Sequence, residues 1–226
     1  MTPIIAQATD DGVHRGAGSG WTVRAVLFDL DGTLVDSTAA IERHTVRWAE
    51  RVGVAAGPVL ALSHGRKDAE FIPLVAPWAD AATELDWLHR LSVEDTEGVT
   101  ALPGARELLT ALAAHHWAVV TSAAREVALS RLRAARLPVP THLVCAEDVQ
   151  RGKPDPEGFL RGADLVGTPP GECLVVEDSV AGVRAGQDAG MAVLAVGEAA
   201  KAAPGGLHLS GVRVRRLPDG RLRLAR

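Results

Sequence analysis

Short, largely apolar runs alternate along this chain with longer segments whose apolar residues are spaced by three or four positions. Runs of this length are typical of buried strands, whereas the longer spacing predicts amphipathic helices. Strands that alternate with helices predict crossover units that build a parallel sheet. The predicted strands are residues 23–28, 117–120, 142–145, 173–176 and 191–196, and the predicted helices cover residues 105–112, 124–136, 159–166 and 180–189.

A different pattern fills the stretch after the first predicted strand. Helical spacing places Ile41, His44, Thr45, Trp48 and Val52 on one face, and nearby glycines end this helix. Further helical segments follow, interrupted by prolines, and we expect no strand between residues 36 and 100. We therefore predict a small helical module inserted after the first strand. Its predicted bounds are residues 37–99, with residues 21–36 and 100–226 forming the core.

The two ends of the chain have patterns of their own. Residues 1–20 are rich in glycine near their end and lack strong periodicity, so we expect a flexible lead-in. Near the C-terminus, Val212, Val214, Leu222 and Leu224 alternate with arginines on either side of residues 217–220. This alternation around a turn sequence predicts an edge hairpin with one solvent-exposed face.

Composition and charge narrow the class of protein and its partners. The 226 residues, 47% hydrophobic, can build one large domain or a core with a small accessory domain. A formal net charge of −4 gives no basic surface for nucleic acid, and no apolar run reaches membrane-spanning length. The N-terminus lacks a secretory signal pattern, so we expect a cytoplasmic protein, monomeric or weakly dimeric. Cys145 and Cys173 each lie in an apolar run, which favours buried reduced thiols over a disulfide or a catalytic thiol.

Polar pairs follow three of the predicted strands at the point where each strand ends. These pairs are Asp29 with Asp31, Thr121 with Ser122, and Glu177 with Asp178. In open α/β sheets, ligands bind beyond the carboxyl ends of the strands. We therefore expect the three pairs to meet in one site.

The acid pair Asp29 and Asp31 suits phosphoryl chemistry. A carboxylate is a competent nucleophile toward phosphorus, and a second carboxyl can protonate the leaving alkoxide and later take a proton from water. Gly32 would let the backbone turn so that both acids face one pocket. The alternative is a turn that merely carries acidic caps.

The other polar residues each have two interpretations. Glu177 and Asp178 are hard acids suited to magnesium, or one of them caps the helix that begins near Ser179. Thr121 and Ser122 could donate hydrogen bonds to a phosphate or cap a helix. Lys153, in a loop fixed by glycine and prolines, could be held over the phosphate and the nucleophile, or it is a solvated surface lysine.

Together these residues resemble the motifs of the haloacid dehalogenase-like hydrolase superfamily. The segment Asp29-Leu30-Asp31-Gly32-Thr33 is similar to the first motif and Thr121, with Ser122, to the second. Lys153 within Gly152-Lys153-Pro154 is similar to the third, and Glu177-Asp178-Ser179 to the fourth. The resemblance runs from about Val23 to Val196, and the order of the motifs makes it specific. It implies an α/β fold, with a Rossmann-like parallel sheet core and a small inserted α-helical cap.

The resemblance also implies a role for each of these residues. Asp29 would attack phosphorus and Asp31 would be the general acid and base. Asp29, the backbone carbonyl of Asp31 and Asp178 would hold Mg²⁺, with Glu177 supporting or ligating. Thr121, Ser122 and Lys153 would bind the phosphoryl oxygens.

In the cap, His64, Gly65 and Arg66 are the best candidates for substrate contact, the alternative being an exposed loop. The expected activity is that of a magnesium-dependent phosphatase acting on small phosphate monoesters, sugar or polyol phosphates, through an aspartyl-phosphate. The sequence is similar to bacterial sugar phosphatases and to the subgroup that contains beta-phosphoglucomutase. A hexose-phosphate mutase and a non-catalytic sugar-phosphate binding protein are the alternatives. The offset of Arg66 from the mutase's cap arginine disfavours the first, and the intact acid pair disfavours the second.

Overall fold

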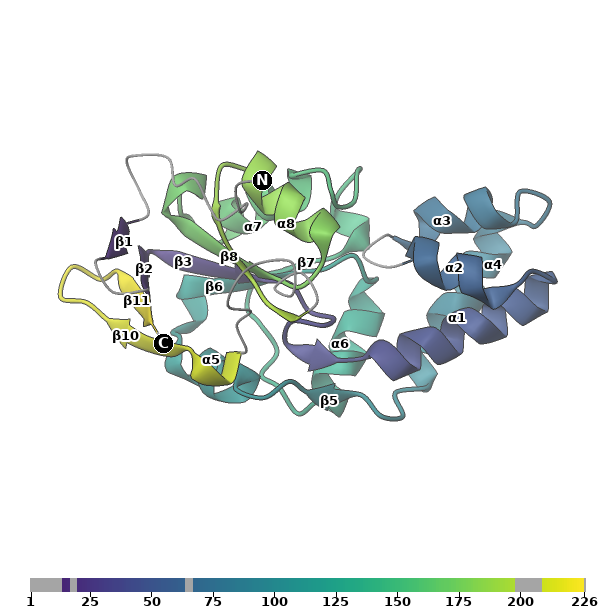
Figure 1. Ribbon diagram of the computed structural model, residues 1–226, viewed down its shortest axis with the longest axis horizontal. Helices are drawn as coiled ribbons and strands as arrows, with labels where there is room; N and C mark the ends of the chain where they lie inside the picture. Colours follow the sequence, from purple (N-terminus) through teal and green to yellow (C-terminus); the bar gives the residue numbers. More distant parts are fainter. Residues whose placement is uncertain (1–13, 17–19, 64–66, 198–208, 226) are drawn as a thin grey trace, which may run out of the picture.

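The protein is described by a computed structural model that covers residues 14–16, 20–63, 67–197 and 209–225. Figure 1 shows an α/β core with a group of helices, α1 to α4, set to one side of it. The core contains a parallel five-stranded sheet in the order β7-β6-β3-β8-β9. Its strands are β3 (Ala25–Phe28), β6 (Trp117–Val120), β7 (Leu143–Val144), β8 (Cys173–Glu177) and β9 (Ala192–Ala195). The predicted α/β fold with a parallel sheet is confirmed.

The central strands are apolar because helices cover both faces of the sheet. Alternate residues of β3 enter opposite cores, with Phe28 on one face and Leu27 on the other. Helices α5 (Ala105–Ala111) and α6 (Arg125–Ala134) pack against the first face. Helices α7 (Glu157–Leu165) and α8 (Val180–Asp188) pack against the second. Within the described ranges, none of the helices is long and apolar enough to cross a membrane.

The inserted helices have a small hydrophobic core of their own, and we call them the cap. They are α1 (Thr38–Val52), α2 (Ala56–Ser63), α3 (Asp68–Val75) and α4 (Ala81–Glu94). Trp48 and Phe71 meet edge to face, with ring centroids 5.6 Å apart, inside a cluster that also holds Ile72 and Leu88. A two-stranded ribbon of β4 (Val35–Asp36) and β5 (Thr100–Ala101) joins the entry and exit of the cap.

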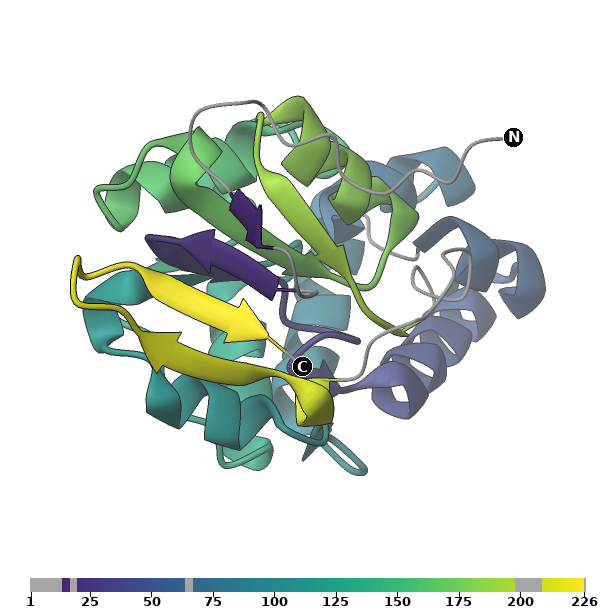
Figure 2. The ribbon, with the colours of Figure 1, turned by 60° about the vertical axis from the view of Figure 1, so that its left-hand side comes forward.

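The C-terminal hairpin forms as predicted, and it completes a second sheet. Strands β10 (Arg213–Arg216) and β11 (Leu222–Ala225) pair with each other, and β11 pairs with β2 (Gly20–Val23). Figure 2 shows this hairpin beside the N-terminal strands. β1 (His14–Gly16), which pairs with β2, lies inside the segment expected as a flexible lead-in, most of which is outside the described residues.

The first predicted strand is in fact divided between the two sheets. Val23 ends β2, whereas Ala25 begins β3 of the parallel sheet. Arg24 lies between them, exposed, and its backbone N–H donates to the carbonyl of Glu172 at 2.8 Å. Its side chain pairs with the Glu172 carboxylate at 2.7 Å. The charged residue therefore marks a change of sheet that the apolar pattern does not reveal.

Both cysteines are buried and unbridged, as predicted. Cys145 begins the turn after β7 and Cys173 begins β8. Burial raises the pKa of each thiol to about 12. A thiol that is protonated at neutral pH is a poor nucleophile, so neither cysteine suits catalysis.

We predict that Leu224→Ala destabilises the whole core, because Leu224 is fully buried in the same hydrophobic cluster as Phe28. Removing a buried leucine side chain costs about 2–5 kcal/mol. Urea denaturation should show this loss, while Val139→Ala, at a position 56% exposed, should change the free energy of unfolding by about 0.5 kcal/mol or less. Equal stability of the two variants would mean that the hairpin is a peripheral addition.

Candidate active site

Asp29 lies at the carboxyl end of the central strand β3, and the sheet fixes its backbone. Its N–H donates to the carbonyl of Val176 at 3.0 Å, which extends the β3–β8 pairing by one residue. Its side chain is buried, and Oδ1 accepts a hydrogen bond from Lys153 Nζ at 2.5 Å. Burial raises the pKa of Asp29 well above its ordinary value, the Lys153 ammonium opposes this, and nearby carboxylates add to it. The carboxylate therefore needs neighbouring cations to stay ionised.

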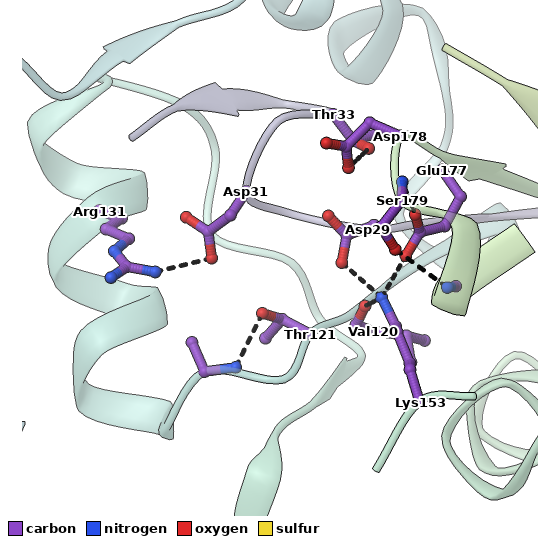
Figure 3. Close-up of polar contacts among 12 residues, drawn as sticks. Asp29, Asp31, Thr33, Val120, Thr121, Arg131, Lys153, Glu177, Asp178 and Ser179 are labelled. Atoms are coloured by element: carbon purple, nitrogen blue, oxygen red, sulfur yellow. Dashed lines mark hydrogen bonds and ion pairs between the residues drawn. The ribbon is translucent and has the colours of Figure 1, made fainter. Parts of the chain in front are cut away.

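Lys153 is a buried residue of the site, so its interpretation as a surface lysine is wrong. Its ammonium donates to Asp29 Oδ1, to Glu177 Oε1 at 2.6 Å and to the carbonyl of Val120 at 3.2 Å. Burial acts to lower the pKa of Lys153, but the two carboxylates outweigh it and raise the pKa above its ordinary value. Lys153 is therefore a fixed positive charge beside Asp29 (Figure 3).

Glu177, the last residue of β8, supports Lys153. Its side chain is only 1% exposed, and both of its oxygens accept hydrogen bonds. Oε1 accepts from Lys153, and Oε2 accepts from the backbone N–H of Ser179 at 2.6 Å. In this arrangement Glu177 anchors the lysine and the start of α8.

Asp178 is not the cap of α8, because Ser179 fills that position. The Ser179 hydroxyl accepts from the Gly182 N–H at 2.9 Å, as an N-cap does. Asp178 Oδ1 instead accepts from the Thr33 hydroxyl at 3.1 Å, across to the loop that follows β3. Burial raises the pKa of Asp178 to about 7, and the neighbouring Glu177 carboxylate adds to this.

Two glycines allow these carboxylates to lie against backbone. Gly32 has a φ of +86°, and a Cβ there would lie 2.0 Å from Asp178 Oδ2. A Cβ at Gly182 would lie 1.7 Å from Glu177 Oε1. Both glycines are therefore required by the close approach of the acid side chains, and Gly32 also by its backbone conformation.

Asp31 has a cation of its own, Arg131 of α6. Arg131 Nη1 donates to Asp31 Oδ2 at 2.7 Å, and the Ser37 hydroxyl donates to Oδ1 at 2.6 Å. Figure 3 shows Asp29 directed toward Lys153 and Asp31 directed toward Arg131. Arg131 is not among the residues that the sequence predicted for the site. Arg131 and Asp31 are 100 positions apart, and in the sequence Arg131 cannot be distinguished from the other basic residues of a surface helix.

Thr121 and Ser122 lie at the end of β6 beside Lys153, as predicted. Thr121 is buried, and its hydroxyl accepts from the N–H of Ala123 at 3.1 Å. These two residues and Lys153 line one pocket, together with Lys67 of the cap. The predicted phosphate-binding residues are thus brought together, and a second lysine joins them that the sequence did not single out for phosphate binding.

The cap touches the loop that carries Lys153. Lys67 Nζ donates to the carbonyl of Val149 at 2.8 Å, and Glu70 Oε1 accepts from the Gly152 N–H at 3.0 Å. A Cβ at Gly152 would lie 2.8 Å from Glu70 Oε1, so the glycine permits this approach. The expected substrate contacts His64, Gly65 and Arg66, which directly precede Lys67, lie outside the described residues.

The site carries more negative than positive charge, which favours binding of a divalent cation. Four carboxylates gather there, and among the described residues Lys153 and Arg131 are the cations that form ion pairs with them. No three His, Cys, Asp or Glu side chains in the described part of the chain form a ready metal cage. Magnesium is commonly held by one or two carboxylates with water and substrate phosphate, so the oxygen-rich donor set fits it.

The structure combines an α/β fold with paired carboxylates at the carboxyl ends of its strands. The family model described as haloacid dehalogenase-like hydrolase matches residues 23–190, and the chain belongs to this family. The matched residues include both acids of the first strand end, Lys153 and the pair that ends β8.

Relatives of known name cover most of the chain. Hexitol phosphatase A from Escherichia coli is 47% identical over 178 residues, which are 76% of this chain and 82% of that protein. Glycerol-1-phosphate phosphohydrolase 2 from Saccharomyces cerevisiae is 33% identical over 189 residues, 77% of this chain and 74% of that protein. A solved beta-phosphoglucomutase from Clostridium difficile has a TM-score of 0.69 at 21% identity, covering 83% of this chain and 92% of that one. At that identity the likeness shows the fold alone.

We predict that Gly182→Ala displaces Glu177 and so removes a partner of Lys153. Breaking a buried ion pair costs about 3–5 kcal/mol, and urea denaturation should show a loss of that size. Gly57→Ala is the matched control, because Gly57 also lies in a helix and a Cβ there meets nothing within 4 Å. If both variants unfold at the same urea concentration, the close packing of Glu177 against Gly182 is contradicted.

Proposed function

We propose that this protein is a magnesium-dependent phosphatase that hydrolyses sugar or polyol phosphates through an aspartyl-phosphate on Asp29. The observation that carries the proposal is the pairing of a buried Asp29 with Lys153, which lines a pocket together with Thr121 and Ser122. The names of the relatives support the class of phosphoric monoester hydrolases and a small polyol or sugar phosphate as substrate.

In the first step, a carboxylate oxygen of Asp29 attacks phosphorus and the ester P–O bond breaks. Asp31 gives a proton to the departing alkoxide oxygen, as a general acid. Lys153 balances the charge on the phosphoryl oxygens, and Thr121 and Ser122 donate hydrogen bonds to them. The contact of Lys153 with Asp29 supports this arrangement, because a cation beside the nucleophile would also be close to the phosphorus that it attacks.

In the second step, a water oxygen attacks the same phosphorus and the bond between phosphorus and Asp29 breaks. The water gives a proton to Asp31, which is now the general base, and inorganic phosphate leaves. Asp31 therefore returns to its starting state, and Asp29 is again a free carboxylate.

Asp29, the backbone carbonyl of Asp31 and Asp178 would hold the magnesium ion, with Glu177 in support. When bound, the metal would supply positive charge that offsets the repulsion between the nucleophilic carboxylate and the phosphate. The raised pKa of Asp178 fits this assignment, since a buried carboxylate without a cation is disfavoured in its charged form. A small phosphate ester is the proposed partner, and a cytoplasmic, monomeric or weakly dimeric protein stays a prediction.

A phosphate-release screen over sugar, polyol and nucleotide monophosphates tests the function. We expect wild type to release phosphate from hexitol, hexose or glycerol phosphates and Asp29→Asn to lose all turnover while staying folded. An assay for interconversion of hexose 1- and 6-phosphates runs on the same samples. Isomerisation faster than phosphate release would favour the mutase, and tight binding without either reaction would favour the binding protein.

We also predict that removing magnesium abolishes activity and lowers stability. A ligand at about 100 times its dissociation constant stabilises the folded state by about 2.7 kcal/mol, so magnesium should raise the melting temperature above that in chelator. Asp178→Asn should diminish this rise, whereas Asp188→Asn, an exposed acid at the far end of α8, should keep it. Full activity in excess chelator would contradict the metal assignment.

A further inference from the structure

Arg131 is a basic residue of the site to which the reaction above assigns no role. It belongs to the middle of α6, yet it is only 7% exposed. A buried guanidinium is unfavourable unless it is paired, and Arg131 is paired with Asp31 at 2.7 Å. Since Ser37 donates to the other oxygen, both oxygens of the proposed general acid and base are held by hydrogen bonds.

The contact between Arg131 and Asp31 separates the two acids according to their proposed roles, nucleophile and general acid. Asp29 and Asp31 are two residues apart, and Lys153 donates to Asp29 alone of the two. Arg131 holds Asp31 on the other side, on α6 (Figure 3). The two carboxylates are thus kept on separate cations, so Asp31 does not compete with Asp29 for Lys153.

The helix that carries Arg131 is also a surface on which the cap rests. The Ser130 hydroxyl donates to the carbonyl of Val93 at 2.9 Å, and Glu126 lies 3.3 Å from His89, both partners being on α4. The positive charge of Arg131 also acts on Asp68, a residue of cap helix α3. Burial raises the pKa of Asp68 to about 6, and Arg131 is the main opposing influence. Asp31 is therefore directed toward the side of the site that the cap covers.

We propose that Arg131 is the positioning residue for Asp31, and that it holds this carboxylate toward the cap, where the leaving group of the substrate must lie. The inference rests on the proposed function, because it assigns Asp31 the proton transfer to the leaving oxygen. In this role Arg131 acts through Asp31, with which it forms its ion pair, and not on the substrate itself. Loss of Arg131 should therefore slow turnover only of substrates whose leaving group needs a proton.

The test compares a sugar phosphate with para-nitrophenyl phosphate, whose phenolate leaves without help from an acid. General acid catalysis is worth about 10²–10⁴-fold, and a misplaced acid should lose part of this. We expect Arg131→Met to lower kcat for the sugar phosphate about 10–100-fold and to change kcat for para-nitrophenyl phosphate by about threefold or less. Arg131→Lys should restore part of the loss, since it returns the charge without the planar fork.

A double-mutant cycle separates positioning from a merely structural role. In an Asp31→Asn background, adding Arg131→Met should change turnover of the sugar phosphate by about twofold or less, because the carboxylate is already absent. Arg133→Met is the control on the same helix, at an exposed position, and should match wild type on both substrates. Melting curves confirm that each variant is folded. If Arg131→Met does not fold, Ser37→Ala and Arg131→Lys should still show the loss on the sugar phosphate only.

Equal losses on the two substrates, or losses that multiply with those of Asp31→Asn, would overturn the assignment of Arg131. These outcomes differ from a failure of the proposed function. In that case wild type itself would release no phosphate from either substrate, and Asp29→Asn would behave like wild type.

Discussion

The excess of carboxylates over cations at one edge of the parallel sheet is the constraint on which this site depends. Asp29, Glu177 and Asp178 are held at strand ends by a sheet whose strands are buried on both faces. Burial raises the pKa of Asp29 and of Asp178, and the neighbouring carboxylates add to the effect. Lys153 offsets part of this by bonding to two of the acids at once. The divalent cation of the proposed function would offset the remaining negative charge.

The cap rests on the two core segments that carry the cations. Helix α3 bonds to the loop of Lys153 through Lys67 and Glu70, and helix α4 bonds to α6, which carries Arg131. The cap is therefore in contact with the segments that carry the cations paired with Asp29 and Asp31. A displacement of the cap would therefore reach Asp29 and Asp31 through Lys153 and Arg131.

The order of strands and helices in the core was predictable from the sequence because it depends on local patterns. Strands buried on both faces need continuous apolar runs, and helices need apolar residues three and four positions apart, so each element has a signature within its own residues. The break at Arg24 escaped prediction because two strands of different sheets follow each other with one residue between them. Only the pairing of Val23 with Leu222 and of Ala25 with Cys173 separates them.

The same division holds for the site. The sequence by itself determined that Asp29, Asp31, Thr121 and Asp178 come at strand ends, because strand ends and acids are visible in order along the chain. The tertiary structure alone decided which cation serves which acid. Lys153 reaches Asp29 across 124 positions and Arg131 reaches Asp31 across 100, and no periodicity extends over such separations. Those pairings arise only when the sheet aligns its strand ends and α6 packs against it, since packing brings together residues that the chain keeps apart.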